Sequence, residues 1–329
     1  MKSKLNIGIL GTANIAKKHI LDTINSLEDY FIITGIASRT LANAKTLAEK
    51  YKTTPYDDYD GLLQNGNLDA IYIPLPNSLH YVWVKKALIK GINVIVEKSL
   101  TCNLENTKEL VEIARINKLV LIENFQFLHH KQLSIIKSIL KENTLGELRC
   151  VKSYFGFPPF KDQDNIRYNK TLGGGALLDA GAYPVRISQA ILGDGLHVDS
   201  SSLFYDINRG VDIWGSAYLK KQNSKVTSHI TFGFDNFYQN SLELWGSEGK
   251  LYANHIFTAP PGFETQIVLE TKKNGKEIIN VPGDDHFKNA FLDFYHKIIT
   301  KENLSTCYIN SINQSKLLEQ LNLKANEQE

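Results

Sequence analysis

The amino-acid sequence predicts an α/β protein that combines an N-terminal doubly wound parallel sheet with a C-terminal α+β domain built on a large, mostly antiparallel sheet. Up to residue 123, short apolar runs alternate with helical patterns, which is typical of parallel strands joined by helices. Beyond residue 145, polar and apolar residues alternate along short segments separated by turns. The length of 329 residues also suits two domains better than one. We therefore expect domains at residues 1–123 and 124–329.

The composition narrows the classes of partner. Hydrophobic residues make up 43% and charged residues 22% of the chain, which is ordinary for a globular protein. A net charge of +2 argues against a nucleic-acid partner and against a polybasic membrane surface. No apolar stretch approaches the ~20 residues that a membrane span needs. The three cysteines, Cys102, Cys150 and Cys307, are far apart and lack metal-ligand spacing, which indicates reduced thiols in a cytoplasmic protein.

The first expected strand, residues 5–10, runs into a glycine-containing turn and then a helix. The turn has the place and shape of the GxGxxG dinucleotide fingerprint of Rossmann domains, written here as Gly-x-Ala-x-x-Ala. Alanine is tolerable at its second position if φ is negative there, and the amides at the helix N-terminus still face the phosphates. This degenerate fingerprint is weak by itself. It predicts cofactor contacts at Gly11, Thr12, Ala13, Asn14 and Ile15.

The second expected strand, residues 31–37, ends in Ser38, Arg39 and Thr40. Sites that prefer NAD place an Asp or Glu here to hold the ribose 2′-hydroxyl, and such a carboxylate repels a 2′-phosphate. This chain offers hydroxyls and a guanidinium instead. Arg39 can bond a 2′-phosphate and stack on the adenine, so we expect NADP(H) to be preferred over NAD(H). An ordinary surface arginine is the alternative interpretation.

A proline-rich segment follows the strand expected at residues 69–73. Two prolines in residues 74–80, Pro-Leu-Pro-Asn-Ser-Leu-His, force a rigid, extended strand exit, and Asn77 or Ser78 can cap the next helix. His80 is expected to pack by the cofactor, although a lone histidine is more often structural. The cofactor residues assigned here are Pro74, Leu75, Asn77 and His80.

The apolar run at residues 91–96 ends abruptly in Glu97 and Lys98. Such a run is typical of a fully buried parallel strand, and ligands bind beyond the carboxyl ends of such strands. We therefore expect Glu97 and Lys98 at the floor of a site. A solvated strand end with an accidental ion pair is the alternative. The strand expected at residues 120–124 closes the first domain, and its Asn124 is also assigned to the cofactor site.

The second half is expected to be a sheet joined to the first domain by a helix through residues 133–140. The tail from residue 287 is expected to be helical, and its helices could pack back on the first domain. The expected strands are residues 147–157, 198–205, 211–219, 225–234, 241–246 and 266–271, with a turn at 273–275.

A glycine-rich segment interrupts this strand pattern at residues 172–186. Three consecutive glycines, residues 173–175, allow the backbone to approach something closely. On the helix that follows, Asp179 and Tyr183 are separated by four residues and share a face. Pro184 removes a helical hydrogen bond, so the helix is expected to bend there or to start later.

Together, the motifs at residues 8–13, 74–80, 97–98 and 173–183 resemble those of the glucose-fructose oxidoreductase / inositol dehydrogenase (Gfo/Idh/MocA) family. The resemblance covers nearly the whole chain. It implies an N-terminal Rossmann domain and a C-terminal domain whose open sheet packs in oligomers, here a homodimer or homotetramer.

The resemblance also assigns roles to individual residues. It makes Lys98 the lysine of the family's Glu-Lys-Pro motif, with Ser99 in place of a proline that is often preceded by a cis bond. Asp179 and Tyr183 match the family's Asp-x-x-x-His/Tyr motif. With tyrosine instead of histidine at this position, the chain resembles the glucose-fructose oxidoreductase, dihydrodiol dehydrogenase and nucleotide-sugar ketoreductase branches of the family. Residues 237–261 look most like 3-ketoreductases that act on nucleotide-linked deoxysugars.

The function we expect is that of an NADPH-dependent ketoreductase or dehydrogenase acting on a sugar or nucleotide sugar. Tyr183 beside Lys98 would be a proton donor with a pKa closer to neutral, and Lys98 would also stabilise the alkoxide. Asp179 would orient Lys98 or hold a sugar hydroxyl; a structural Tyr–Asp pair is the alternative. Arg167 and Arg186 could meet a substrate phosphate or serve surface or interface roles.

The sequence also bears on metal binding and on two alternative functions. His129 and His130 lack a carboxylate partner at metal spacing, so we predict no metal. An activity on a small polyol, like that of dihydrodiol or xylose dehydrogenases, is the main alternative. A regulator that senses the dinucleotide without turnover is disfavoured, because a sensor does not need a proton donor beside a lysine.

Overall fold

The computed structural model describes residues 4–64 and 67–327. The chain forms two compact units, and both are discontinuous in sequence. The first contains residues 1–124 and 287–312, and the second contains residues 125–286 and 313–329. The second segment of the first unit therefore lies, along the chain, between the two segments of the second unit.

The first unit is built on a six-stranded parallel sheet with the order β3-β2-β1-β4-β5-β6. This is the strand order of dinucleotide-binding domains, and it places the carboxyl ends of all six strands on one edge. β5 lies between β4 and β6, and all four of its residues are buried, as expected for a strand of mostly β-branched residues. The strands are β1 (Leu5–Leu10), β2 (Phe31–Ala37), β3 (Thr54–Tyr56), β4 (Ala70–Ile73), β5 (Asn93–Val96) and β6 (Leu121–Glu123).

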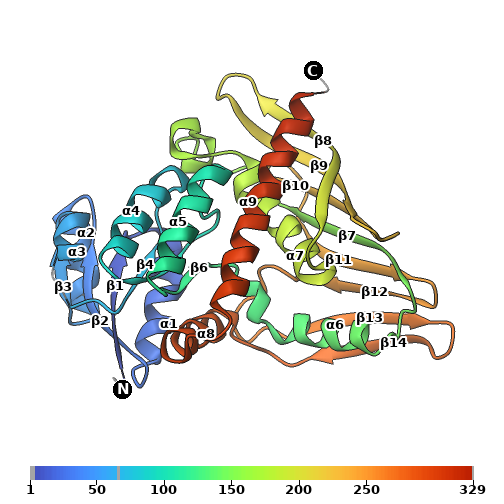
Figure 1. Ribbon diagram of the computed structural model, residues 1–329, viewed down its shortest axis with the longest axis horizontal. Helices are drawn as coiled ribbons and strands as arrows, with labels where there is room; N and C mark the ends of the chain where they lie inside the picture. Colours follow the sequence, from blue (N-terminus) through green and yellow to red (C-terminus); the bar gives the residue numbers. More distant parts are fainter. Residues whose placement is uncertain (1–3, 65–66, 328–329) are drawn as a thin grey trace. The chain divides into compact units, whose positions relative to one another are not determined.

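Helices flank both faces of this sheet (Figure 1). Alternate residues of β4 enter two different apolar cores: Ile71 and Ile73 pack towards α4 and α5, and Tyr72 packs towards α1 and α8. The predicted doubly wound arrangement is therefore confirmed. The elements are a π-helical turn η1 (Ala16–Ile20), α1 (Leu21–Ser26), α2 (Leu41–Lys50), α3 (Tyr59–Gln64), α4 (Asn77–Ile89), α5 (Leu104–Ile116), α8 (His286–Thr300) and the start of α9 (Leu304–Asn326).

The start of α4 differs from the prediction. The helix begins at Asn77 itself and its N-cap position is Pro76, so neither Asn77 nor Ser78 occupies the N-cap position that was expected for them. Pro76 has φ −59° and ψ 147°, and its carbonyl accepts a hydrogen bond of 2.9 Å from the amide of Leu79. The ring of Pro76 fixes φ without a side-chain cap.

The second unit is built on an eight-stranded sheet with the order β14-β13-β12-β11-β7-β10-β9-β8. All neighbours are antiparallel except β7 and β10, which are parallel. The predicted mostly antiparallel sheet is confirmed. The strands are β7 (Leu148–Gly156), β8 (Leu196–Asp206), β9 (Val211–Lys221), β10 (Thr227–Gly233), β11 (Gln239–Gly246), β12 (Gly249–Asn254), β13 (Thr265–Thr271) and β14 (Gly275–Val281).

One face of this sheet is covered by α6 (Lys131–Lys141), α7 (Ala182–Leu192) and the part of α9 that belongs to this unit (Figure 1). A single apolar core joins these helices to the inward residues of the strands. The opposite face carries partly exposed aromatic side chains, among them Trp214, Trp245 and Tyr252.

The regular α-helix that contains Tyr183 starts late enough to place Pro184 in its first turn, as one of the two expectations had it. A π-helical turn, η5 (Leu177–Gly181), runs directly into α7, and Pro184 is the third residue of α7. Widened turns of this kind are frequent where a helix departs from regular hydrogen bonding. None of the helices in the described residues is long and apolar enough to cross a membrane.

Candidate active site

The turn after β1 approaches the loop after β4 closely. Gly11 has φ +128°, and a Cβ atom at this position would lie 2.8 Å from Leu75 Cδ2. The amide of Gly11 donates to the carbonyl of Ala37 at 3.0 Å, which ties the turn to the end of β2. Ala13 does not have a positive φ, so the condition for alanine at this position is met. Only glycine fits the position of Gly11, because a side chain would be both strained and obstructed.

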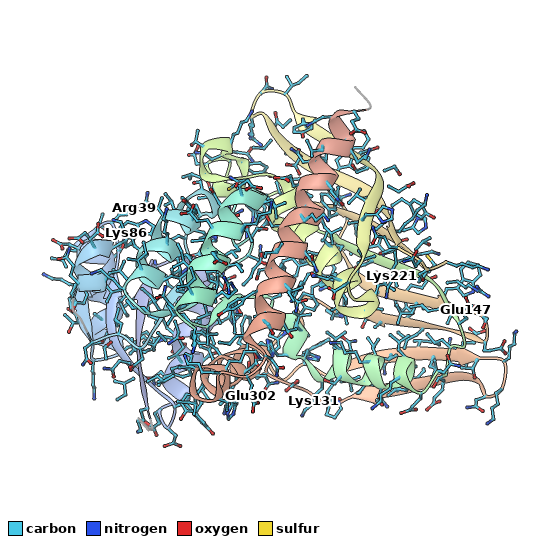
Figure 2. All side chains as sticks on the ribbon, in the orientation of Figure 1. Arg39, Lys86, Lys131, Glu147, Lys221 and Glu302 are labelled. Carbon is cyan, nitrogen blue, oxygen red and sulfur yellow. The ribbon has the colours of Figure 1, made fainter. Side chains whose placement is uncertain are left out.

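The end of β2 carries hydroxyls and a cation. The Thr12 hydroxyl lies 3.3 Å from that of Ser38, which is buried. Arg39 is exposed at the surface of the first unit (Figure 2). Burial raises the pKa of Tyr59, while the nearby Arg39 charge lowers it. No carboxylate occupies residues 38–40, so this strand end suits a phosphate better than a bare ribose hydroxyl.

Glu97, at the end of β5, is held by two neighbours. Its Oε1 atom accepts hydrogen bonds of 2.8 Å from the Tyr72 hydroxyl and from Asn124 Nδ2. Asn124 is only 2% exposed, and its Oδ1 atom has no hydrogen-bond partner among the described residues. A buried acceptor without a hydrogen bond costs free energy, so this oxygen is suited to accept a hydrogen bond from a ligand, for example from a carboxamide NH₂ group. The strand ends of this unit therefore fit a nicotinamide dinucleotide.

Lys98 lies in a turn that is fixed on several sides. The Lys98–Ser99 peptide bond is cis, although serine stands where the family has proline. The amide of Leu100 donates to Glu123 Oε1 at 2.9 Å. The amide of Glu97, before the turn, donates to the carbonyl of Ile73 at 3.1 Å. These contacts hold the backbone on both sides of Lys98.

His80 connects this turn to the proline-rich loop. Its Nδ1 atom lies 2.7 Å from the Ser99 carbonyl oxygen, and its Nε2 atom lies 2.7 Å from the Leu75 carbonyl oxygen. The side chain is fully buried, so in this arrangement it does not itself touch a ligand. Burial lowers the pKa of His80 to about 4, although the two carbonyl oxygens favour the charged ring. His80 acts on the site through the two segments that it joins.

In the second unit, Tyr183 lies in an aromatic cage. Its ring centroid is 4.9 Å from that of Phe155, 5.6 Å from Phe257, 5.7 Å from Phe125 and 5.9 Å from Phe127. Three of these contacts are edge-to-face, an arrangement that aromatic rings favour. The cage gives the tyrosine ring a single orientation.

Asp179 pairs with an arginine that the sequence did not associate with it. Arg167 Nε donates to Asp179 Oδ2 at 2.6 Å, and the Asp179 carboxylate raises the pKa of Arg167. The Arg167 guanidinium also lies 4.8 Å from the Phe160 ring centroid. Arg186, the other arginine considered, donates to Gln189 on its own helix. The structure thus shows a role for Arg167 that was not among those considered from the sequence, namely that of ion-pair partner to Asp179.

The predicted close approach at the three glycines is confirmed, and the partner is the chain itself. A Cβ atom at Gly174 would lie 2.5 Å from the Arg167 carbonyl oxygen. Gly175 has φ +113°, and a Cβ atom there would overlap Asp212 Oδ1. The amide of Leu177 donates to Asp212 Oδ2 at 2.5 Å. Sequence reasoning missed Asp212, because it is separated from the glycines by more than thirty residues along the chain.

Two family models match the chain. The model of the oxidoreductase family with an NAD-binding Rossmann fold (GFO_IDH_MocA) matches residues 5–125, and that of the GFO/IDH/MocA C-terminal domain matches residues 134–252. The chain is 34% identical over 315 residues to a dTDP-3,4-didehydro-2,6-dideoxy-alpha-D-glucose 3-reductase of Actinomadura kijaniata, covering 96% of this chain and 94% of that protein. It is 31% identical to a D-xylose 1-dehydrogenase (NADP(+)) of Haloferax volcanii, covering 80% of each.

A solved structure is similar over the whole chain. The crystal structure of a 3-ketoreductase from Actinomadura kijaniata, in complex with NADP and TDP-benzene, has a TM-score of 0.93 and 33% identity. The match covers 98% of each chain. The order of motifs, the strand orders of the two sheets and these matches agree, and the chain belongs to the Gfo/Idh/MocA family of oxidoreductases.

Proposed function

We propose that the protein is an NADPH-dependent ketoreductase that reduces a keto group of a nucleotide-linked sugar, or catalyses the reverse oxidation. The observation that carries the proposal is that this chain has both a buried tyrosine on α7 and a lysine in a braced turn after β5. The similarity to a dTDP-sugar 3-reductase and to a 3-ketoreductase crystallised with NADP and TDP-benzene supports the choice of substrate and cofactor.

The proposed cofactor site lies along the carboxyl ends of the first unit's strands. The turn after β1 and the following helix would hold the pyrophosphate, and Ser38, Arg39 and Thr40 would hold the adenosine 2′-phosphate. Asn124 offers a buried acceptor, and Glu97 holds its amide in place. When bound, the nicotinamide supplies the hydride to the carbonyl carbon or takes it back. The remaining assigned residues are Gly11, Thr12, Ala13, Asn14, Ile15, Pro74, Leu75, Asn77 and Lys98, with His80 acting through Leu75 and Ser99.

In the proposed mechanism, the residues of this chain manage the proton and the charge. The Tyr183 hydroxyl donates a proton to the substrate oxygen as it becomes an alkoxide, and it takes the proton back in the oxidation. The Lys98 ammonium stabilises the negative charge on that oxygen. The aromatic cage keeps the tyrosine ring in one orientation, so little entropy is lost in the reaction.

The two roles proposed for Asp179 are to orient Lys98 and to hold a sugar hydroxyl. Its Oδ2 atom is held by Arg167, which fixes the carboxylate, and this carboxylate could accept a hydrogen bond from a sugar hydroxyl.

A small polyol is the second candidate substrate. The similarity to a D-xylose 1-dehydrogenase, and the 30% identity to a trans-1,2-dihydrobenzene-1,2-diol dehydrogenase of Xenopus tropicalis, favour it.

We further propose that the protein works in the cytoplasm as a homodimer or homotetramer joined through the outer face of the eight-stranded sheet. The partly exposed Trp214, Trp245 and Tyr252 on that face support this assembly, since such patches mark interfaces. Light scattering of wild type beside Trp245→Glu tests it.

The function is tested by cofactor titration followed by turnover. We would measure NADPH and NADH binding by fluorescence, then screen keto-sugars, nucleotide-linked keto-sugars and small polyols. Tyr183→Phe should bind NADPH normally, and both Lys98→Ala and Tyr183→Phe should lose turnover by at least about 100-fold, the size typical of general acid catalysis. Tyr252→Phe, on the outer face of the sheet, is the matched control and should turn over like wild type. Wild-type turnover in the Tyr183→Phe variant would contradict the assignment, and tight NADPH binding without turnover of any substrate would revive the regulator.

A further inference from the structure

The start of the helix that carries Asp179 and Tyr183 is held by a buried carboxylate from β9. Asp212 is 9% exposed and lies in the second position of that strand. Its Oδ2 atom accepts the amide of Leu177 at 2.5 Å; burial raises the pKa of Asp212 to about 6, while the amides of Leu177 and Ala176 lower it. Amides at the start of a helix have no partner within the helix, and they carry its positive dipole end. Asp212 supplies the missing acceptor from a different element.

The backbone before the helix is shaped to fit this carboxylate. Gly175 lies directly against Asp212 Oδ1, where any side chain would overlap it. Its φ of +113° is also a conformation that other residues rarely adopt. Two separate features, the absent side chain and the backbone angle, therefore bring the carboxylate and the helix start together.

The other side of the same turn is held by Arg167. Its carbonyl oxygen accepts the amide of Gly175 at 2.9 Å, and its side chain donates to Asp179 at 2.6 Å. The turn from Gly175 to Asp179 is thus clamped between β9 and the loop that contains Arg167. Tyr183 follows one turn later, in an aromatic cage that leaves its ring little freedom to compensate for a shift of the helix.

We propose that Asp212 is a positioning residue for the reaction: by fixing the start of the helix through Leu177, it sets the orientation of Asp179 and Tyr183. This inference rests on the proposed function, which makes Tyr183 the proton donor. Asp212 does not touch the reacting atoms. It acts through the backbone, and its loss leaves two amides buried without an acceptor.

The two informative substitutions remove this support in steps. Asp212→Asn keeps one oxygen that can accept from Leu177 but presents an NH₂ group to the remaining amide donors. Asp212→Ala removes both acceptors. Asp199→Asn is the matched control. Asp199 is an aspartate of the neighbouring strand β8, and it pairs with the partly exposed Lys220 instead of with the helix start.

The kinetic test compares kcat, KM and the NADPH dissociation constant. A displacement of about 1 Å can cost about 100-fold in rate, so we expect kcat to fall by roughly 10- to 100-fold in Asp212→Ala and by less in Asp212→Asn. NADPH binding should stay within about twofold of wild type, and any rise in KM, which would come from Asp179, should be smaller than the fall in kcat. In a Tyr183→Phe background, Asp212→Ala should lower kcat by a smaller factor than in wild type, because the part of its effect that acts through the Tyr183 hydroxyl is already lost. A purely structural aspartate would instead give equal fold-losses in both backgrounds.

Hydrogen–deuterium exchange supplies a readout that needs no substrate. In Asp212→Asn, amides 176–183 should exchange faster than in wild type, while the rest of the second unit and the Asp199→Asn protein should not change. Unchanged exchange in this segment, or wild-type kcat in a folded Asp212 variant, would overturn the proposal. If the wild-type protein shows no turnover at all, the proposed function fails by itself. Exchange then decides alone whether Asp212 positions the helix.

Discussion

The buried His80 allows a quantitative prediction about pH. Between its ordinary pKa of 6.5 in the unfolded chain and its value of about 4 in the folded protein, the unfolded state binds more protons. Stability must therefore rise with pH across this window and fall as the solution is acidified through it. The difference of about 2.5 units corresponds to roughly 3 kcal/mol, at about 1.4 kcal/mol per unit.

The assay compares chains that do and do not titrate at this position. Of the three tryptophans, only Trp83 belongs to the first unit, and it lies on the same helix as His80. In a Trp214→Phe, Trp245→Phe background, urea unfolding followed by Trp83 fluorescence reports on this helix. Between pH 7 and pH 4, the free energy of unfolding of the chain with His80 should fall by roughly 3 kcal/mol more than that of His80→Asn. His296→Asn, which removes an exposed histidine of the same unit, should behave like the parent.

A direct titration can refute the reasoning. At pH 6, a ring with a pKa of about 4 is about 1% protonated, so the NMR signals of His80 should show a neutral imidazole there. A resonance that is lost in His80→Asn and titrates at 6.5 or above would show that the two carbonyl oxygens balance or outweigh burial. Parallel pH slopes for the two chains in the urea experiment would lead to the same conclusion.

Three further substitutions test separate parts of the structure. Arg39→Asp should weaken NADPH binding at least about tenfold and leave NADH binding unchanged or improved, because a carboxylate repels the 2′-phosphate; a fluorescence titration with both cofactors measures this. Phe257→Ala should lower the free energy of unfolding of the second unit by about 3–5 kcal/mol in urea, since Phe257 is fully buried against the Tyr183 ring. Arg167→Ala should reduce kcat more than Arg167→Lys in steady-state assays, because only alanine removes the positive charge that residue 167 places beside Asp179.

The parallel sheet was predictable because its strands are marked by local chemistry. The run that forms β5 is apolar and β-branched and is buried along its whole length, so its position in a sheet core follows from composition. Of the strands that escaped prediction, β12 alternates along its short length, whereas β3 and β14 lack such a signal. β3 has three residues and contains Pro55, and β14 is an edge strand whose residues are mostly exposed. Neither shows the alternation that identifies a strand.

The residues of the candidate site also differ in whether a local sequence pattern marks them. Lys98, Asp179 and Tyr183 stand in motifs that are contiguous along the chain, so local patterns are enough to nominate them. The partners that hold them could not be predicted in this way. Asp212 meets the glycine turn only because β9 lies beside it in the fold, and His80 meets Ser99 only because the loops after β4 and β5 are neighbours. Contacts of this kind depend on strand order, which no local pattern specifies.

The discontinuity of both units has a consequence for the order in which the protein can fold during synthesis. Phe291 and Phe294 of α8 belong to the core of the first unit, and Leu317 and Leu321 of α9 belong to the core of the second. Neither core can close until these two helices have left the ribosome. Nascent chains that stop before α8 should therefore stay sensitive to protease and bind chaperones, although the strands from β1 to β14 have been made.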